Sequence, residues 1–340
     1  MRESDFARLL TSYLSKFLPS QRNLSANTIK SYRDTFRLFL IFCQDQEGIK
    51  TEKICLAGIS DRMILSFLDW IETKRSCSIA TRNQRLAALH AFFRYAQAES
   101  PENLLMYQKI LHIPFKKDSE HRVSYLTPDG MKLLLSMPDT RTRNGRRDLI
   151  LMTLLYDSAA RVQELIDLKV RDIRFESPAT IILHGKGRKV RCIPLMTKTS
   201  SMLESYLKES NLWEKPERLD SYLFFNSRQE QLTRAGISYI IDKYYTQASQ
   251  NGGAILPERI SPHVFRHTKA MHLLQANINL IYIRDFLGHS NVTTTEIYAK
   301  ADAEIRRKLL EKAYINLSPS DLPEWNDDKD LMTWLQELCT

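Results

Sequence analysis

Apolar residues recur at intervals of three and four along the first 112 positions, which is the period of an amphipathic helix. The pattern is clearest in SDFARLLTSYLSKFL, SANTIKSYRDTFRLFLIFCQ, DRMILSFLDWIETK and SIATRNQRLAALHAFFRYAQAE. Because short loops separate these segments, the sequence predicts a bundle of roughly four or five helices over residues 1–112.

The period breaks at residues 113–124, IPFKKDSEHRVS, whose charged composition predicts a linker. Helical spacing resumes at Thr127, a candidate N-cap before Pro128. In ATIILHGKGRKVRCIPL apolar and polar residues alternate on both sides of a glycine-containing turn at 185–187, and this pattern predicts a β-hairpin. Helices are expected again from residue 198 to 313. The predicted fold class is mainly α with a small β-sheet: a helical bundle, then a mixed α/β domain at 125–316 and a tail at 317–340.

The chain of 340 residues is 43% hydrophobic, so it can bury the cores of two domains. Its net charge of +9 is unevenly distributed, because residues 321–340 carry −5 and the remainder therefore +14. A basic body of this kind favours a polyanionic partner, either nucleic acid or an anionic membrane surface.

The five cysteines are scattered and never form a CxxC pair, which indicates a reducing compartment without a disulfide framework or zinc knuckle. The N-terminus lacks the apolar core of a signal peptide, and no apolar run approaches the length of a membrane span. We therefore expect a cytoplasmic protein, associated with the nucleoid when bound to DNA, without membrane attachment, metal or cofactor.

The stretch SPHVFRHTKAMH concentrates histidines at a predicted helix start, with Ser261 as N-cap and Pro262 in the first position. His263, Arg266 and His267 then share a face at i, i+3 and i+4. The helix N-terminus and the guanidinium favour an anion and disfavour a metal cation. The alternative is a capped helix with ordinary surface histidines.

Six residues together supply the side-chain groups that phosphodiester cleavage needs: Arg161, Lys186, His263, Arg266, His289 and Tyr298. Arginines and histidines can bind the non-bridging oxygens of a phosphate. A lysine can protonate the leaving oxygen, and a tyrosine phenol can attack phosphorus without a metal. Each residue alone also has an ordinary explanation, such as a surface helix position, a solvated turn or a core aromatic.

In this order the six residues match R–K–HxxR–H–Y, and the chain resembles the tyrosine recombinases, or phage-integrase-like site-specific recombinases. The blocks that carry the resemblance are LLYDSAARVQEL, HGKGRKVRCIPL, SPHVFRHTKAMHLL and LGHSNVTTTEIYAK. Three positions depart from the family pattern: Phe265, Lys269 and Asn277.

The resemblance implies a helical core-binding domain and a catalytic domain that together enclose DNA. It implies that Arg161 and Arg266 bind the scissile phosphate, that Lys186 is the general acid and that Tyr298 is the nucleophile. His263 would assist proton transfer from the tyrosine, and His289 would bond the phosphate. Outside these six, Glu164 would orient the Arg161 region.

Eight further residues are candidate DNA contacts, with a solvated polar face as the alternative: Lys30, Arg33, Thr81, Arg82, Arg85, Arg188, Lys189 and Arg234. In the tail, four apolar residues share one helical face: Leu331, Trp334, Leu335 and Leu338. That face can dock on its own domain or, as the resemblance implies, on a neighbouring protomer.

The resulting hypothesis is an enzyme that cleaves and rejoins double-stranded DNA at specific recombination sites through a 3′-phosphotyrosine. It would integrate, excise or transpose a mobile element as a homo-tetramer with a Holliday-junction intermediate, alone or with related recombinases. The alternatives are a type IB topoisomerase-like nicking–closing enzyme and a catalytically silent DNA-binding regulator.

Overall fold

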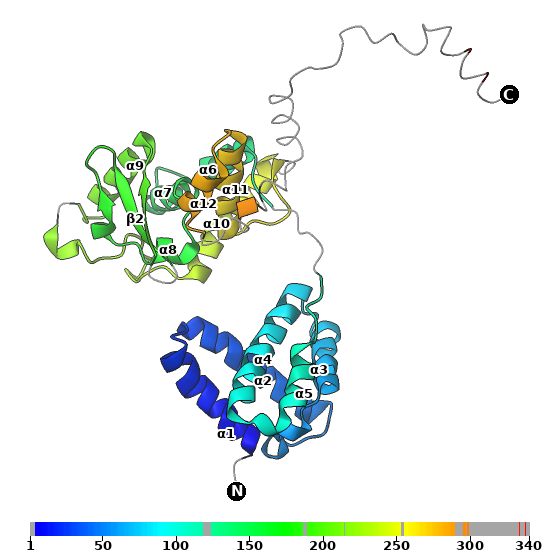
Figure 1. The fold of residues 1–340 in the computed structure, drawn as a ribbon. Coiled ribbons are helices and arrows are strands. Elements are labelled where there is room, and N and C mark those ends of the chain that lie inside the picture. Colours follow the sequence, from blue (N-terminus) through cyan, green and yellow to red (C-terminus); the bar gives the residue numbers. More distant parts are fainter. Residues whose placement is uncertain are drawn as a thin grey trace. The chain divides into compact units, whose positions relative to one another are not determined.

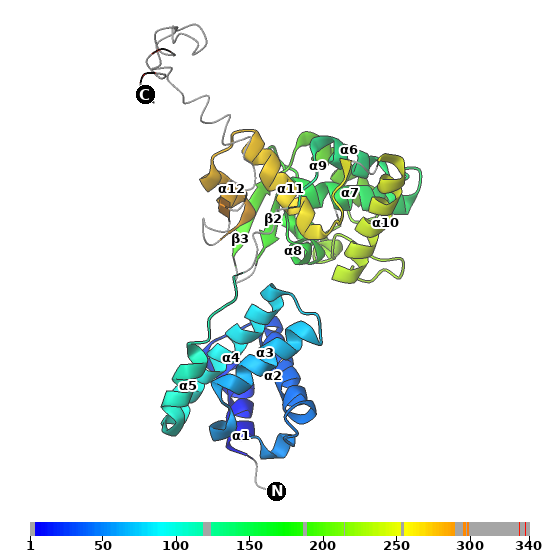
Figure 2. The same cartoon turned by 90° about the vertical axis from the view of Figure 1, so that its right-hand side faces the viewer.

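The computed structural model describes residues 4–117, 124–185, 189–213, 215–252 and 255–289, together with Thr295, Glu296, Tyr298, Thr333 and Glu337 (Figures 1 and 2). The chain divides into two compact units, Met1–His121 and Arg122–Thr340, and each is described by itself.

The first unit is a helical bundle, as the apolar spacing predicted. Its main helices are α1 (Asp5–Ser12), which continues into η1 (Tyr13–Gln21), α2 (Ala26–Asp45), α3 (Asp61–Thr73), α4 (Ile79–Glu99) and α5 (Leu104–Leu111). Short turns η2 (Thr51–Lys53), η3 (Leu56–Gly58) and η4 (Pro101–Asn103) connect them.

Serine side chains begin four of these helices by accepting a backbone N–H from the first turn: Ser4, Ser25, Ser60 and Ser78. The core between the helices is largely aromatic, and Phe92 of α4 packs edge-on against Phe6 and Phe36.

The second unit contains helices α6 (Pro128–Ser136), α7 (Arg143–Asp157), α8 (Val162–Ile166), α9 (Thr197–Glu209), α10 (Arg234–Gly252), α11 (Pro262–Gln275) and α12 (Leu280–Leu287). Turns η5 (Val170–Asp172) and η7 (Pro216–Arg218) also belong to it. Among its described residues this unit has one sheet, and Figure 2 shows the strands of this sheet beside the helices.

The sheet has antiparallel order β1-β2-β3, formed by β1 (Ile173–Arg174), β2 (Thr180–His184) and β3 (Val190–Pro194). The β2–β3 pair confirms the predicted hairpin, with Leu183 opposite Arg191. Because side chains alternate along a strand, Ile181 and Leu183 enter the core, while neighbouring positions face outward.

Helix α7 lies at the centre of the second unit, where it contacts both α9 and α11. Its residues Ile150, Leu151, Leu154 and Leu155 are almost completely buried. A smaller apolar cluster forms where α11 packs on α12, and it contains Met271, Leu287 and Tyr298. This cluster brings together the segments that carry Arg161, Arg266, His289 and Tyr298.

The structure accommodates two of the residues that depart from the pattern of the resembled family, Asn277 and Lys269. Asn277 has φ 60°, the left-handed conformation that asparagine tolerates at a helix end. Lys269 forms an ion pair with Asp157 at 3.4 Å and lies over the Tyr156 ring, so its charge is compensated. Ser261 occupies the predicted N-cap position of α11, but its side chain makes no capping hydrogen bond.

Two predictions fall largely outside the described residues. The predicted linker at 113–124 is described only up to residue 117 and at residue 124. In the predicted tail helix the structure describes only Thr333 and Glu337, so the docking of its apolar face stays a prediction.

Candidate active site

Arg161 is placed by the start of α8, where it is the N-cap residue. Glu164, three residues later, accepts hydrogen bonds from the Arg161 backbone N–H and from its Nη1, both at 2.7 Å. Arg161 Nη2 also donates to the Gly288 carbonyl at 3.3 Å. The predicted support of Arg161 by Glu164 is therefore confirmed, and the guanidinium is held from two sides.

Arg266 lies on α11 with only 4% of its surface exposed. Its Nη1 donates to the Ala159 carbonyl at 2.7 Å, and its Nη2 donates to the Leu287 carbonyl. Burial, followed by repulsion from Arg161 and Arg191, lowers the pKa of Arg266 to about 9, so it stays charged at neutral pH.

The two arginines meet at the C-terminal end of α12, which supplies the Leu287 and Gly288 carbonyls. The last carbonyls of a helix lack helical partners and carry the negative end of its dipole, so they suit cations. Ala159 contributes the third carbonyl from a left-handed backbone conformation with φ 47°, which is uncommon for a residue with a Cβ.

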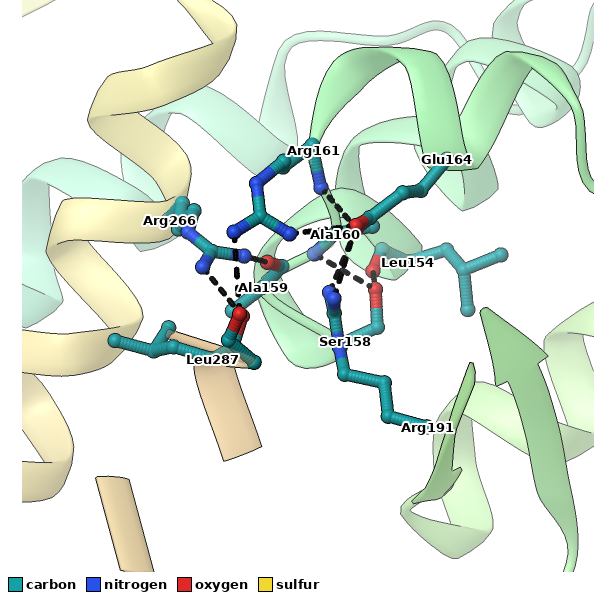
Figure 3. Close-up of polar contacts among 10 residues, drawn as sticks. Leu154, Ser158, Ala159, Ala160, Arg161, Glu164, Arg191, Arg266 and Leu287 are labelled. Atoms are coloured by element: carbon teal, nitrogen blue, oxygen red, sulfur yellow. Dashed lines mark hydrogen bonds and ion pairs between the residues drawn. The ribbon is translucent and has the colours of Figure 1, made fainter. Parts of the chain in front are cut away.

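Arg191 of β3 was not among the sequence-predicted residues, although it belongs to this group. It forms a paired ion bridge with Glu164, from Nη1 to Oε1 at 2.9 Å and from Nη2 to Oε2 at 2.7 Å. Figure 3 shows the Glu164 carboxylate between the guanidinium groups of Arg161 and Arg191. Burial alone would raise the pKa of Glu164, but the two arginines outweigh burial and lower it.

Two glycines allow this close packing. A Cβ at Gly288 would lie 3.1 Å from Arg191 Nη1, and Gly288 also has φ +66°, which ends α12 in the left-handed conformation. A Cβ at Gly185 would lie 3.1 Å from Glu164 Oε1, so the hairpin leaves β2 beside this carboxylate.

Lys186 and Arg188 lie outside the described residues, within the gap at 186–188. The positions at either end of the gap are described, and the Gly185 N–H donates to the Lys189 carbonyl at 2.7 Å. Lys189 itself is exposed.

His289 follows the end of α12, and its Nδ1 lies 2.9 Å from the Thr295 hydroxyl. Burial, then the charges of Arg266 and Arg161, lower the pKa of His289 to about 4. The imidazole is therefore neutral at neutral pH and can donate one N–H.

His263 lies in the first turn of α11 and is exposed. Desolvation, then Arg266 and Arg161, lower its pKa. Of the described residues, none lies within hydrogen-bond distance of its ring.

Tyr298 is buried, with 1% of its surface exposed, and its Oη lies 2.9 Å from Nδ1 of His267. Burial raises the pKa of the phenol, while Arg266 opposes this shift. Sequence reasoning placed His267 on the correct face of α11 but assigned it no role. The ring nitrogens of His272 lie 2.8 Å from Tyr156 Oη and 3.0 Å from the Leu126 carbonyl, so this histidine bonds the surrounding structure.

The candidate DNA contacts differ in exposure. Lys30, Arg33 and Arg234 are exposed, although Arg234 Nε also donates to Gln163 at 2.7 Å. Thr81 is partly buried at the start of α4, with its hydroxyl 3.1 Å from that of Ser78.

Arg82 is a correction, because it is only 3% exposed and its Nε lies 3.5 Å from Glu72. A guanidinium buried against a carboxylate inside the bundle is not available to a DNA backbone. Arg85 is partly buried, and its Nη1 donates to the Ser31 carbonyl and to the Thr35 hydroxyl, both at 3.1 Å, so it links α4 to α2, and its contact with DNA stays a prediction. Arg82 lies on the inner side of α4, whereas sequence reasoning counted it as a surface position.

Comparison with known proteins identifies the family. Residues 124–304 match the Phage integrase family, and residues 10–100 match its N-terminal SAM-like domain. The chain belongs to the phage integrase family. It is a tyrosine-type site-specific recombinase, which confirms the resemblance, the fold class and the expected enzyme class.

Individual relatives cover nearly the whole recombinase chain. It is 35% identical over 338 residues to the protein named integrase/recombinase y4rC of Sinorhizobium fredii, covering 99% of both chains. It is 30% identical over 306 residues to tyrosine recombinase XerC of Oceanobacillus iheyensis, covering 89% of this chain and 94% of that one. The XerH recombinase bound to difH substrate is 25% identical, with a TM-score of 0.65 over 90% of this chain and 84% of that one.

Two absences hold for the described part of the recombinase. No helix there is long and apolar enough to cross a membrane. No group of three or more His, Cys, Asp or Glu side chains there could hold a metal ion.

Proposed function

We propose that this recombinase cleaves and rejoins double-stranded DNA at specific sites through a covalent 3′-phosphotyrosine at Tyr298. The observation that carries the proposal is that Arg161 and Arg266 both donate to carbonyls at the end of α12. Tyr298 packs in the apolar cluster of α11 and α12 residues. The guanidinium groups of Arg161 and Arg191 bond Glu164, and that of Arg266 bonds backbone carbonyls, so the site has an excess of positive charge suited to a phosphodiester.

In the proposed reaction Arg161 and Arg266 bind the non-bridging oxygens of the scissile phosphate. Negative charge grows on these oxygens as Tyr298 Oη attacks phosphorus, so preorganised guanidinium groups stabilise the transition state more than the ground state. The bond from phosphorus to the 5′ oxygen breaks, and Lys186 gives that oxygen a proton. Attack by a 5′ hydroxyl reverses these steps and releases the tyrosine.

Histidines complete the proposed site. His289 is kept neutral by its lowered pKa, so it can donate a hydrogen bond to a phosphate oxygen without adding charge. His263, in the first turn of α11, lies at the positive end of that helix, and the family resemblance gives it a part in proton transfer.

The proposed biological role is integration, excision or transposition of a mobile element. Its support is the fold shared with a transposon integrase: the Tn1549 integrase in complex with transposon right end DNA is 19% identical, with a TM-score of 0.67. We further propose a homo-tetramer on DNA, alone or with related recombinases, acting on the nucleoid in the cytoplasm without a metal or cofactor.

The test is covalent capture on a nicked suicide substrate that carries a candidate site, analysed on denaturing gels without metal. The wild-type chain should form a protein–DNA adduct, and Tyr298→Phe should form none. Tyr239→Phe is the matched control, because Tyr239 is 71% exposed and should leave the adduct unchanged.

Binding without an adduct at a verified site would refute the proposed chemistry and favour a DNA-binding regulator. An adduct followed by supercoil relaxation without strand exchange would instead favour a topoisomerase-like enzyme.

A further inference from the structure

The phenol of Tyr298 has one described polar partner, and that partner is a histidine that the motif pattern does not include. Nδ1 of His267 lies 2.9 Å from the phenolic oxygen, and the two ring centroids are 5.6 Å apart. His267 is one residue after Arg266 on α11, so the same helix turn holds a phosphate-binding candidate and the tyrosine.

The protonation states follow from the surroundings. Burial, followed by the charges of His263 and Arg266, lowers the pKa of His267 to about 4, so its ring is neutral. Burial raises the pKa of Tyr298, so the phenol keeps its proton. When the ring proton of His267 is on Nε2, the phenol donates to Nδ1, and this tautomer is the one that the role argued below requires.

We propose that His267 is a further catalytic residue, which accepts the phenolic proton of Tyr298 at Nδ1 while Oη attacks phosphorus. The inference rests on the proposed function, because it requires Tyr298 to be the nucleophile. The step balances: the O–H bond breaks, an N–H bond forms at Nδ1, and the oxygen electron pair forms the new bond to phosphorus. Lys186 supplies the separate proton for the departing 5′ oxygen.

A bound phosphodiester would make His267 a better base than it is in the free chain. An anion close to an imidazole favours its protonated form and raises its pKa. The phosphate between Arg161 and Arg266 would therefore move the His267 pKa upward, toward the neutral range where a general base works best. The low value in the free chain keeps the base unprotonated until substrate arrives.

His263 is the competing candidate, since the family resemblance gives it the role of assisting this proton transfer. The two histidines lie one helical turn apart, so they share the environment of α11. Only His267 reaches the phenol within the described residues, whereas His263 is exposed and has no described hydrogen-bond partner.

The experiment compares His267→Gln with His263→Gln in the full-length chain on the nicked suicide substrate. Single-turnover rates of adduct formation are measured at saturating protein from about pH 5.5 to 9, where general acid–base groups of this kind titrate. Gln is polar and of comparable size, but it cannot take up a proton near neutral pH.

The proposal expects His267→Gln to lower the rate about 10²–10⁴-fold near pH 7, the usual contribution of a general base. Its remaining rate should rise tenfold per pH unit, because the phenol must then ionise without help. His263→Gln should keep the wild-type shape of the profile. The reverse pattern, with the steep profile in His263→Gln, would overturn the proposal.

A second measurement does not depend on the fold of the variants. Fluorotyrosine at position 298 lowers the phenol pKa in an otherwise unchanged chain. If His267 is the base, the pH at which the rate levels off should follow the histidine and stay in place. A shift that follows the fluorinated phenol would overturn the proposal. Failure of the wild-type chain to form any adduct would instead refute the proposed function.

Discussion

The carboxylate of Glu164 is the contact that joins Arg161, Arg191 and the β2–β3 hairpin end, so its removal is a direct test of how this site is built. Glu164→Gln keeps the shape of the side chain but removes the charge. Arg161 and Arg191 now donate to both carboxylate oxygens of Glu164. The glutamine amide has one acceptor oxygen, so it cannot accept all of these hydrogen bonds.

The expected loss is large because the ion pair is buried. The side chain of Glu164 is 3% exposed and that of Arg191 is 11% exposed, so the variant leaves a cation inside the protein without its partner. Breaking a buried pair in this way costs about 3–5 kcal/mol of unfolding free energy. For a unit of this size, each kcal/mol lowers the melting temperature by about 2–4 °C, so the total is roughly 6–20 °C.

The assay is thermal or urea unfolding of the full-length chain at neutral pH, with Glu209→Gln as the matched control. Glu209 also accepts two hydrogen bonds from one guanidinium, that of Arg146, but these side chains are 28% and 41% exposed. A surface pair contributes about 0–1 kcal/mol, so the control should change little. Equal destabilisation by the two variants would refute the reasoning. Adding Arg191→Met to Glu164→Gln should restore part of the loss, because no unpaired cation then remains at position 191.

Three further expectations concern binding, chemistry and pH. Arg33→Ala, at a side chain that is 61% exposed, should weaken DNA binding and reduce its salt slope by about 1, whereas Arg82→Ala should lower the melting temperature and leave that slope unchanged. Arg161→Lys should lower the rate of adduct formation about 10²–10³-fold with little loss of DNA binding, because lysine cannot present two directed donors; an unchanged rate would contradict the role of Arg161. The pKa of about 4 for His267 and His289 lies below the unfolded value of about 6.5, so the unfolded chain binds more protons between these values. Unfolding free energy should therefore rise from about pH 4 to 6.5 and then level off, and an opposite slope in urea titrations would contradict the assigned shifts.

Much of the architecture could be predicted because local rules determine it. Apolar spacing of three and four predicted α2, and alternation about glycines predicted β2 and β3. Thr127 caps α6 by accepting from the Gly130 N–H at 3.1 Å, as its position before Pro128 indicated. These features depend on residues within a few positions of one another, so a single sequence contains them.

The contacts that complete the site could not be predicted in this way, because they join distant segments. Arg191 of β3 bonds Glu164 across 27 positions of the chain. His267 and Tyr298 are 31 positions apart, and they meet where Tyr298 joins the apolar cluster of α11 and α12 residues. The prediction that Arg82 contacts DNA was wrong for a related reason. A basic residue on a helix is expected at the surface, and its burial depends on Glu72 of the neighbouring helix α3.

The way in which the arginines are held explains why a phosphodiester suits this site better than a protein carboxylate would. Backbone carbonyls hold Arg266 and one nitrogen of Arg161, and these dipoles orient a guanidinium without cancelling its charge. Among the described residues, Glu164 is the one carboxylate bonded to Arg161, and it is shared with Arg191. The carbonyls therefore fix the orientation of the guanidinium groups without neutralising them, and positive charge remains in excess. An additional carboxylate bonded to Arg266 would hold the guanidinium equally well, but its negative charge would repel the substrate phosphate.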